Sequence, residues 1–241
     1  MRVLRGFGAA AATITVFCAV AAQAGAVGPG NSSLLLFGGT DIWRDGAFLA
    51  GGLLWSPAGL DTGGFTFKLL LGGGRYVYPS SGLREDVDGT LISASALPGW
   101  RMTRDGLTID VFAGPIVQDY RLTPYDPGSL LRGPYAGGQI AADLWYLPNP
   151  STMMALDGSI ASIELIGSAR AAVGWRSSPE SFFIGPESQA LWCKDYQQLR
   201  FGAHVTGYRI DALEWSAAAG WAIESFHREG VYLRIGFNTR L

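Results

Sequence analysis

The sequence contains few charged residues and almost no lysine. Only 16% of its 241 residues are charged, whereas an average soluble domain has about 25%. Lysine occurs twice, at Lys68 and Lys194, and the net charge is −2 with no basic run. Domains that bind nucleic acid carry a basic patch or stripe. The charge pattern therefore excludes nucleic acid as a partner.

Cysteine is equally scarce. Cys18 and Cys193 are the only two in the chain. Two cysteines exclude a disulfide framework and a multi-cysteine zinc site. No other residues have the spacing of metal ligands, so the sequence predicts neither a metal nor a cofactor.

Long hydrophobic runs are missing after the N-terminus, so no transmembrane helix is expected there. The first 26 residues follow a different pattern, with two arginines, an apolar stretch over residues 7–22, and small-residue sites ending at Ala24 and Ala26. This is the layout of a secretory signal peptide, and the stretch is shorter than the ~20 residues of a membrane span. We expect cleavage near Ala24 or Ala26, which leaves residues 27–241 as a single domain.

The sequence has instead many segments in which apolar and polar residues alternate. In the last of them, Val231, Leu233 and Ile235 lie on one face, and Tyr232 and Arg234 lie on the other. This period of two indicates β-strands. About twelve such segments, each of roughly 10–14 residues, suit a tilted crossing of a bilayer. They start near residues 33, 46, 64, 88, 107, 135, 151, 164, 181, 198, 212 and 230. The fold class predicted is all-β, an antiparallel outer-membrane-type β-barrel of about 12 strands.

Connection lengths and tryptophans support this prediction. Short connections such as residues 103–106 alternate with longer ones such as residues 122–134, as in barrels with short periplasmic turns and longer external loops. Residues 56–64 are an exception, because they are long where a short turn is expected. Four strands that would run toward the periplasm end in tryptophan, which is typical of an aromatic girdle at one membrane interface. These are Trp55, Trp100, Trp145 and Trp175, of which Trp145 has the wrong parity.

Charged and polar residues share the face that alternates with the apolar one. If the apolar face contacts lipid, this second face lines the lumen. A twelve-stranded barrel is intermediate between eight-stranded barrels, which side chains fill, and 16–18-stranded barrels, which leave an aqueous channel. The number of strands is therefore compatible with a filled lumen or with an open one. The candidate lumen-lining residues are Lys68, Asp110, Asp143, Arg170, Glu187, Arg200, His204 and Glu214.

Catalysis by these residues is an alternative. His204 would lie near Ser216 or Glu214 of the next strand, as in a Ser–His–acid hydrolase. However, the sequence has no Gly-x-Ser-x-Gly elbow. Carboxylate pairs suited to glycoside hydrolysis arise in any lumen with several acids. The two pairs are Asp110 with Asp143, and Glu187 with Glu214. We interpret all of these residues as structural and expect no enzymatic activity.

Several stretches together resemble one bacterial family, the cellulose biosynthesis accessory protein BcsS. They are DIWRDG at 41–46, GGLLWSP at 51–57, LPGWR at 97–101, DLWY at 143–146, GPE at 185–187, GAHVTG at 202–207 and EWSA at 214–217. The resemblance implies an outer-membrane β protein linked to cellulose production in Gram-negative bacteria. No catalytic residues are established for the family.

These observations lead to one functional prediction. We expect a non-catalytic outer-membrane accessory barrel that binds, anchors or helps to pass the glucan. Its expected partners are outer-membrane lipid, cellulose and other cellulose-synthesis components. The alternatives are a barrel enzyme that modifies lipid or acyl groups, and a small passive porin. Tyrosines expected on external loops are candidates for stacking on sugar rings: Tyr78, Tyr120, Tyr125, Tyr135 and Tyr196.

Overall fold

The computed structural model describes residues 32–80, 82–129, 131–194, 196–225 and 228–241. The expected signal peptide and its cleavage near Ala24 or Ala26 lie outside the described residues. Within them, no helix is long and apolar enough to cross a membrane.

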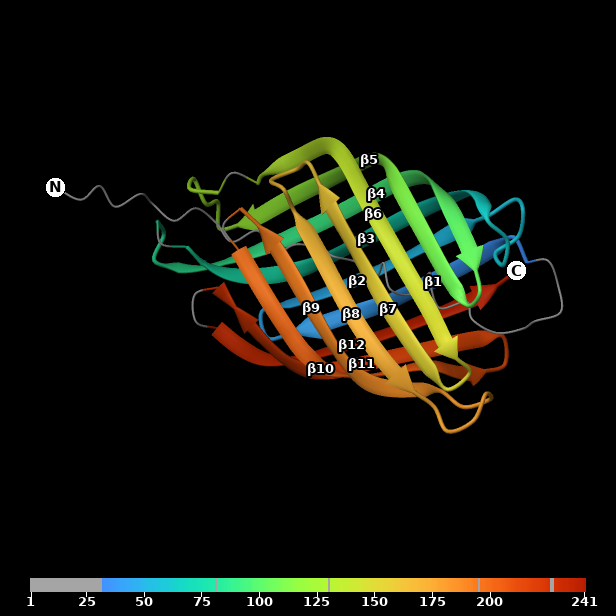
Figure 1. Cartoon of the computed structure of the whole chain (residues 1–241). Helices are drawn as coiled ribbons and strands as arrows, with labels where there is room; N and C mark the ends of the chain where they lie inside the picture. Colours follow the sequence, from blue (N-terminus) through green and yellow to red (C-terminus); the bar gives the residue numbers. More distant parts are fainter. Residues whose placement is uncertain (1–31, 81, 130, 195, 226–227) are drawn as a thin grey trace.

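Twelve antiparallel strands of the described chain form a closed barrel (Figure 1). Each strand pairs with the next in sequence, and β12 pairs with β1 to close the sheet. The prediction of an antiparallel barrel of about 12 strands is confirmed. The strands are β1 (Leu34–Trp43), β2 (Gly46–Trp55), β3 (Gly64–Ser80), β4 (Glu85–Arg104), β5 (Leu107–Thr123), β6 (Gly133–Asn149), β7 (Thr152–Ala161), β8 (Gly167–Trp175), β9 (Phe183–Cys193), β10 (Tyr196–Ile210), β11 (Leu213–Glu224) and β12 (Arg228–Arg240).

The observed strands begin within three residues of the predicted positions. Strands β3 to β6 are longer than predicted, at 17–20 residues. Residues 85–87, which we expected in a loop, are therefore part of β4. The hairpin of β3 and β4 continues because its backbone pairing extends to Ser80 and Glu85. Polar residues such as Asp86 and Asp88 are exposed there, so the apolar pattern ends before the strands do.

The two ends of the barrel differ. We call the end at which β12 finishes the C-terminal rim, and the opposite end the distal rim. Turns at the C-terminal rim include Asp105–Gly106, in which both residues have positive φ (47° and 80°), as a tight two-residue hairpin turn requires. At the distal rim, Arg228 forms ion pairs with Asp45 and Asp86, both at 3.3 Å.

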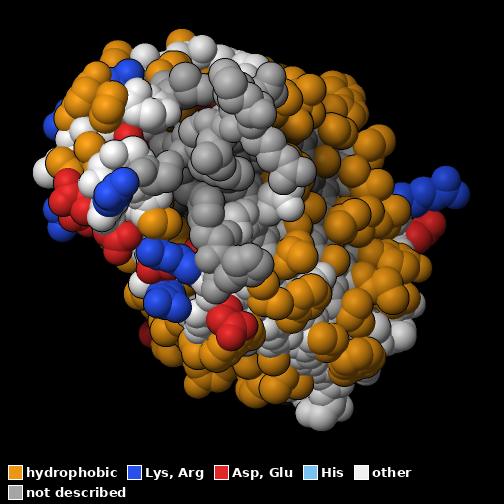
Figure 2. Space-filling model, turned by 90° about the vertical axis from the view of Figure 1, so that its left-hand side faces the viewer, with side chains coloured by type: hydrophobic (Ala, Val, Ile, Leu, Met, Phe, Trp, Pro, Cys, Tyr) orange, Lys and Arg blue, Asp and Glu red, His pale blue; other side chains and the backbone are white. Residues whose placement is uncertain are grey.

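Apolar side chains cover the outer wall of the barrel. In β12, Val231, Leu233 and Ile235 are exposed, whereas Tyr232 is buried. Viewed from the distal rim, hydrophobic side chains form a broad surface along one side, and charged side chains gather at the rim (Figure 2). Three tryptophans of the expected girdle point outward near the C-terminal rim: Trp55, Trp100 and Trp175. Trp145 instead points into the barrel.

The alternation has one irregularity in β10. A bulge between Thr206 and Tyr208 leaves Gly207 unpaired with a φ of 85°. A bulge adds one residue and reverses the faces that follow it. Strict alternation with Arg200 and His204 would place Tyr208 on the inner face. This placement is wrong, because Tyr208 is 50% exposed on the outer wall.

The long connection between β2 and β3 folds into the C-terminal rim. Its Leu60 is buried against Leu35, Leu54 and other apolar residues of the inner wall. The carbonyl of Leu60 accepts a hydrogen bond from Arg101. The exceptional length of this connection therefore lets the chain place an apolar side chain inside the barrel.

Candidate functional site in the barrel interior

A belt of polar side chains crosses the inner wall from β4 to β10. Its members are successive cross-strand neighbours, so one residue of each strand contributes. Asp110, Asp143 and Asp157 stand side by side at its centre. The belt consists of Arg101, Asp110, Asp143, Asp157, Arg170, Gln189 and Arg200, all of them buried.

Each carboxylate of the belt has a cationic partner. Arg101 binds Asp110 with two hydrogen bonds of 2.6 and 2.7 Å. Lys68 reaches Asp143 from β3, and Arg170 lies 3.2 Å from Asp157. Buried charges are costly unless they are paired and hydrogen-bonded. This neutralisation makes a polar interior compatible with a folded barrel.

Inside the barrel, three ion pairs between described residues join strands that are not neighbours. Lys68 of β3 pairs with Asp143 of β6. The other two pairs are Arg200 of β10 with Asp41 of β1, at 2.7 Å, and Arg234 of β12 with Glu187 of β9, at 2.6 Å. In each case two strands lie between the partners. The described side chains therefore bridge the lumen rather than only line it.

The structure places all eight candidate lumen-lining residues inside the barrel, and each is at most 9% exposed. It does not bring them together as one group. Glu187 binds Arg170, Tyr232 and Arg234. In contrast, Glu214 pairs with Arg209 at the C-terminal rim.

Three further charged residues of the network were not predicted: Asp41, Arg101 and Asp157. Arg234, which alternation in the last strand places on the inner face, also belongs to the network. The signal that identifies them is parity. In β4, for example, Leu91, Leu97 and Arg101 are separated by even numbers of residues and all face inward.

His204 is hydrogen-bonded to residues other than the expected Ser216 and Glu214. Its Nδ1 lies 3.0 Å from Thr206 Oγ1 and its Nε2 lies 3.1 Å from the carbonyl of Val173. Ser216 is the cross-strand neighbour of Thr206 rather than of His204. Both ring nitrogens are thus held by neighbours other than Ser216 and Glu214. A triad needs the nucleophile within hydrogen-bond reach of the base.

The two carboxylate pairs considered for glycoside hydrolysis are also occupied. Asp110 and Asp143 are fully buried neighbours, each held by its own cation. Glu187 and Glu214 have different partners, as described above. No three His, Cys, Asp or Glu side chains among the described residues are grouped so as to hold a metal ion.

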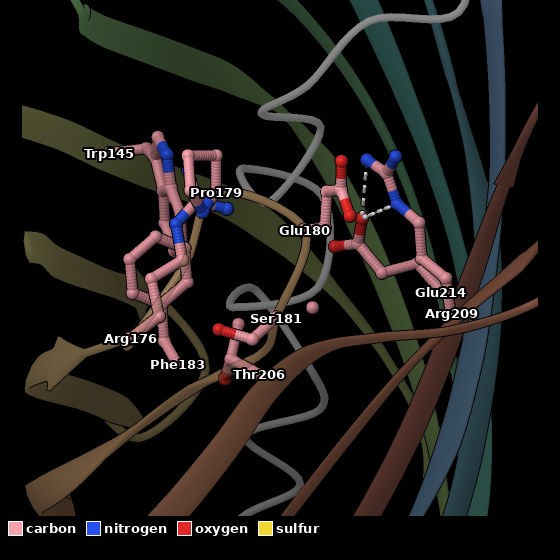
Figure 3. A pocket seen from close by; sticks show the side chains of 10 residues that line it. Trp145, Arg176, Pro179, Glu180, Ser181, Phe183, Thr206, Arg209 and Glu214 are labelled. Atoms are coloured by element: carbon pink, nitrogen blue, oxygen red, sulfur yellow. Dashed lines mark hydrogen bonds and ion pairs between the residues drawn. The ribbon is translucent and has the colours of Figure 1, made fainter. Parts of the chain in front are cut away.

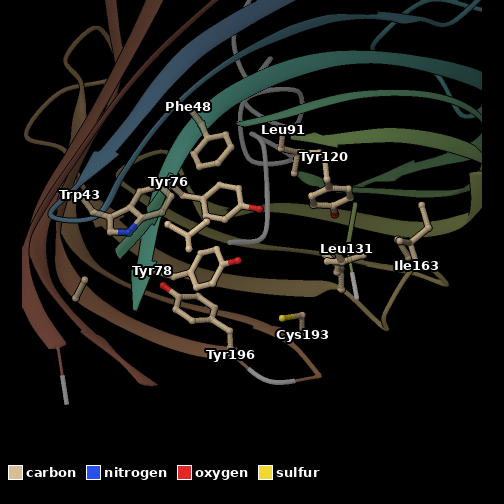
Figure 4. Close-up of a cluster of buried hydrophobic side chains, with 14 of the residues drawn as sticks. Trp43, Phe48, Tyr76, Tyr78, Leu91, Tyr120, Leu131, Ile163, Cys193 and Tyr196 are labelled. Carbon is tan, nitrogen blue, oxygen red and sulfur yellow. The ribbon is translucent and has the colours of Figure 1, made fainter. Parts of the chain in front are cut away.

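Aromatic rings fill the distal half of the lumen (Figure 4). Trp43, Phe48, Tyr76 and Tyr78 form a stack along β1, β2 and β3, with successive ring centroids 5.4, 6.5 and 6.1 Å apart. Tyr78 donates a hydrogen bond of 3.0 Å to Asp126 of the β5–β6 connection. This connection therefore folds toward the lumen.

The expected placement of tyrosines on external loops is wrong for Tyr78, Tyr120, Tyr135 and Tyr196, which all lie in strands. Tyr78, Tyr120 and Tyr196 are buried members of the aromatic cluster. The reason is that β3, β5, β6 and β10 extend over positions that we assigned to loops. Tyr125 is exposed at 66%, and Tyr135 is partly buried against Tyr120.

A pocket opens at the C-terminal rim, beneath the connection between β8 and β9 (Figure 3). It has about 390 Å³ of empty space, part of which is open to solvent. Two sides face each other across it, one with Trp145, Arg176 and Phe183 and the other with Glu180 and the Arg209–Glu214 pair. Burial and the nearby Arg209 lower the pKa of the Arg176 guanidinium.

Comparison with protein families gives one match over most of the chain. The family model described as "Cellulose biosynthesis protein BcsS" matches residues 35–241, which is the whole barrel from β1 onward. No curated protein sequence matches the chain significantly.

Solved structures share the architecture at low sequence identity. A mutant of the TodX monoaromatic hydrocarbon channel superposes with a TM-score of 0.50 and 11% identity, covering 88% of this chain and 91% of that one. The KdgM porin has a TM-score of 0.45 and 11% identity, covering 86% and 99%. The β domain of the Bordetella autotransporter BrkA has a TM-score of 0.45 and 14% identity, covering 88% and 99%. At this identity, the TodX channel is similar in fold alone.

Proposed function

The chain belongs to the BcsS family of cellulose biosynthesis proteins, and from this premise we propose that it is a non-catalytic outer-membrane barrel that holds the glucan during its export. The family and the fold show that the chain is a barrel protein related to cellulose biosynthesis. The outer-membrane location, the accessory role and the contact with glucan are the proposal.

The outer-membrane location is supported by the outer wall. Exposed apolar residues surround the barrel, as at Leu49, Ile92, Ile140 and Val231. Such residues are costly in water and favourable in lipid. The shortest strands have 9–11 residues, which is enough for a tilted strand to cross the hydrocarbon core.

The observation that carries a holding role is the set of ion pairs across the lumen. Lys68–Asp143, Arg200–Asp41 and Glu187–Arg234 each connect the inner wall between separated strands. A side chain that bridges the lumen occupies the space through which a passive porin conducts. The pairs therefore favour a barrel that binds or anchors polymer over one that conducts freely.

The non-catalytic role is supported by the state of the candidate catalytic groups. Both nitrogens of His204 have partners, and neither is a serine. The buried acids each pair with a cation. Purified protein incubated with outer-membrane lipids should give no product by mass spectrometry. A lipid product that disappears in His204→Ala would overturn the non-catalytic role.

A deletion strain tests the function itself. We expect it to synthesise cellulose at the normal rate but to retain less at the cell surface, with more in the periplasm or the medium. Planar-bilayer recordings of the purified barrel should show no steady conductance. Normal surface cellulose in the deletion strain would contradict the proposal, and a steady ohmic channel would favour the porin alternative.

A further inference from the structure

The pocket at the C-terminal rim contains a buried hydrogen-bond donor that lacks an acceptor. Trp145 is only 4% exposed, and its indole Nε1 has no hydrogen-bond partner among the described residues. Its ring is fixed edge-to-face against Phe183, with the centroids 6.2 Å apart. Buried donors in native structures nearly always have partners. A buried indole N–H in the wall of a pocket thus indicates that the pocket receives an acceptor.

The remaining walls of the pocket hold donors and acceptors in fixed positions. Arg176 donates from Nε to the carbonyl of Pro150 at 2.7 Å, and its guanidinium lies 4.4 Å above the centroid of the Phe183 ring. Arg209 and Glu214 are 3.3 Å apart on the opposite side. Ser181 donates to the carbonyl of Ser178 at 2.8 Å, which fixes the connection over the pocket.

The charges of the pocket restrict the chemistry of its ligand. Arg176 and Arg209 supply two positive charges, and Glu180 and Glu214 supply two negative ones. A phosphate or a carboxylate would lie against two carboxylates, which disfavours an anion. A neutral ring with several hydroxyl groups uses both kinds of wall, since hydroxyls donate to carboxylates and accept from guanidinium and indole N–H groups.

We propose that this pocket binds one sugar ring of the glucan, with the Trp145 N–H donating to a ring hydroxyl. The inference rests on the proposed function for the identity of the sugar, and on the pocket for its neutral, hydroxyl-rich chemistry. The pocket is open to solvent, so a sugar ring bound there would be only partly enclosed. A ring held here would lie at the mouth of the barrel, between the β8–β9 connection and the inner walls of β6 and β10.

Binding of cellotetraose to the purified full-length barrel, measured by isothermal titration calorimetry in detergent, tests the site. Trp145→Phe keeps the ring but removes the N–H, and we expect it to weaken binding by about 2- to 12-fold, the usual net contribution of one hydrogen bond. Trp215→Phe is the matched control. The Trp215 indole N–H is also buried without a partner among the described residues, but it does not line the pocket. Its loss should leave the affinity unchanged.

A second variant, at an exposed position, distinguishes loss of binding from loss of folding. Glu180 is exposed on the β8–β9 connection, so Glu180→Gln should fold normally and bind cellotetraose more weakly. No binding by the wild type, equal losses in Trp145→Phe and Trp215→Phe, no loss in Glu180→Gln, or tight binding of inorganic phosphate would each overturn the sugar site. The proposed function is judged separately, by the surface cellulose of the deletion strain. That result can stand even if cellotetraose does not bind.

Discussion

Arg200 and Asp41 are 159 residues apart in the sequence, yet Arg200 Nη1 lies 2.7 Å from Asp41 Oδ2 inside the barrel. The Arg200 guanidinium also packs against Trp43 and Tyr232, 4.8 and 5.2 Å from the ring centroids. The neighbouring strands β9 and β11 carry the inward acids Glu187 and Glu214, yet the ion-pair partner of Arg200 is on β1. Closure of the barrel brings β1 opposite β10.

Loss of this pair should destabilise the barrel strongly. Removing one partner of a buried ion pair leaves an uncompensated charge, which costs about 3–5 kcal/mol. We expect Arg200→Ala to lower the unfolding temperature on heat-modifiability gels. The control is Arg104→Ala, because the Arg104 side chain is 89% exposed and pairs with exposed Asp105. This substitution should change the unfolding temperature little.

The double variant Arg200→Ala/Asp41→Ala isolates the interaction. With both charges removed, the loss of stability should be smaller than the sum of the two single losses, because the second substitution no longer leaves an unpaired charge. Strictly additive losses in urea unfolding would mean that the pair contributes nothing as a pair.

The membrane-facing surface can be tested with two isoleucines of the outer wall. Ile235 lies in the middle of β12 and Ile210 at the rim end of β10, and both are exposed. An arginine facing lipid costs about 2–4 kcal/mol at the bilayer midplane and about 0–1 kcal/mol near the interface. Ile235→Arg should therefore reduce folding into lipid vesicles much more than Ile210→Arg. Equal folding of both would argue against a membrane-spanning barrel.

If the barrel lies in the outer membrane with its C-terminal rim toward the periplasm, the distal rim faces outward, and this orientation predicts a labelling pattern. Gly82, in the β3–β4 connection, is exposed at the distal rim, and Asp105 is exposed at the C-terminal rim. An epitope inserted after Gly82 should be labelled on intact cells, whereas one inserted after Asp105 should need permeabilisation. The reverse pattern would show that the C-terminal rim faces outward.

The aromatic cluster depends on the absence of a side chain at Gly89. A Cβ there would lie only 2.2 Å from the Tyr76 ring, and this ring cannot move freely because it is stacked with Phe48 and Tyr78. Overpacking of this kind costs about 1–3 kcal/mol. We expect Gly89→Ala to lower the urea midpoint. Gly138→Ala, where nothing lies within 4 Å of the added Cβ, should leave it unchanged.

The sequence determined the barrel and the faces of its strands. Alternation is a local property, since successive side chains of a strand point to opposite sides. The positions of the strands, the lipid-facing set such as Val231 and Ile235, and the grouping of Arg200 with His204 on one face follow from it. Alternation gave a wrong result in two situations. At Gly207, a bulge adds one residue and reverses the faces of the residues that follow. In β3 and β4, backbone pairing continues beyond the last residues of the apolar pattern.

Only the tertiary structure decided which inward side chains meet. Parity assigns a side chain to the lumen, but the number of strands, their tilt and the register of closure decide its neighbours across the lumen. Asp41 with Arg200, Lys68 with Asp143 and Glu187 with Arg234 are therefore long-range results of closure. The same holds for Trp145. Its parity shows that it points inward, whereas its unpaired N–H and the walls of its pocket exist only because the β8–β9 connection folds over the rim.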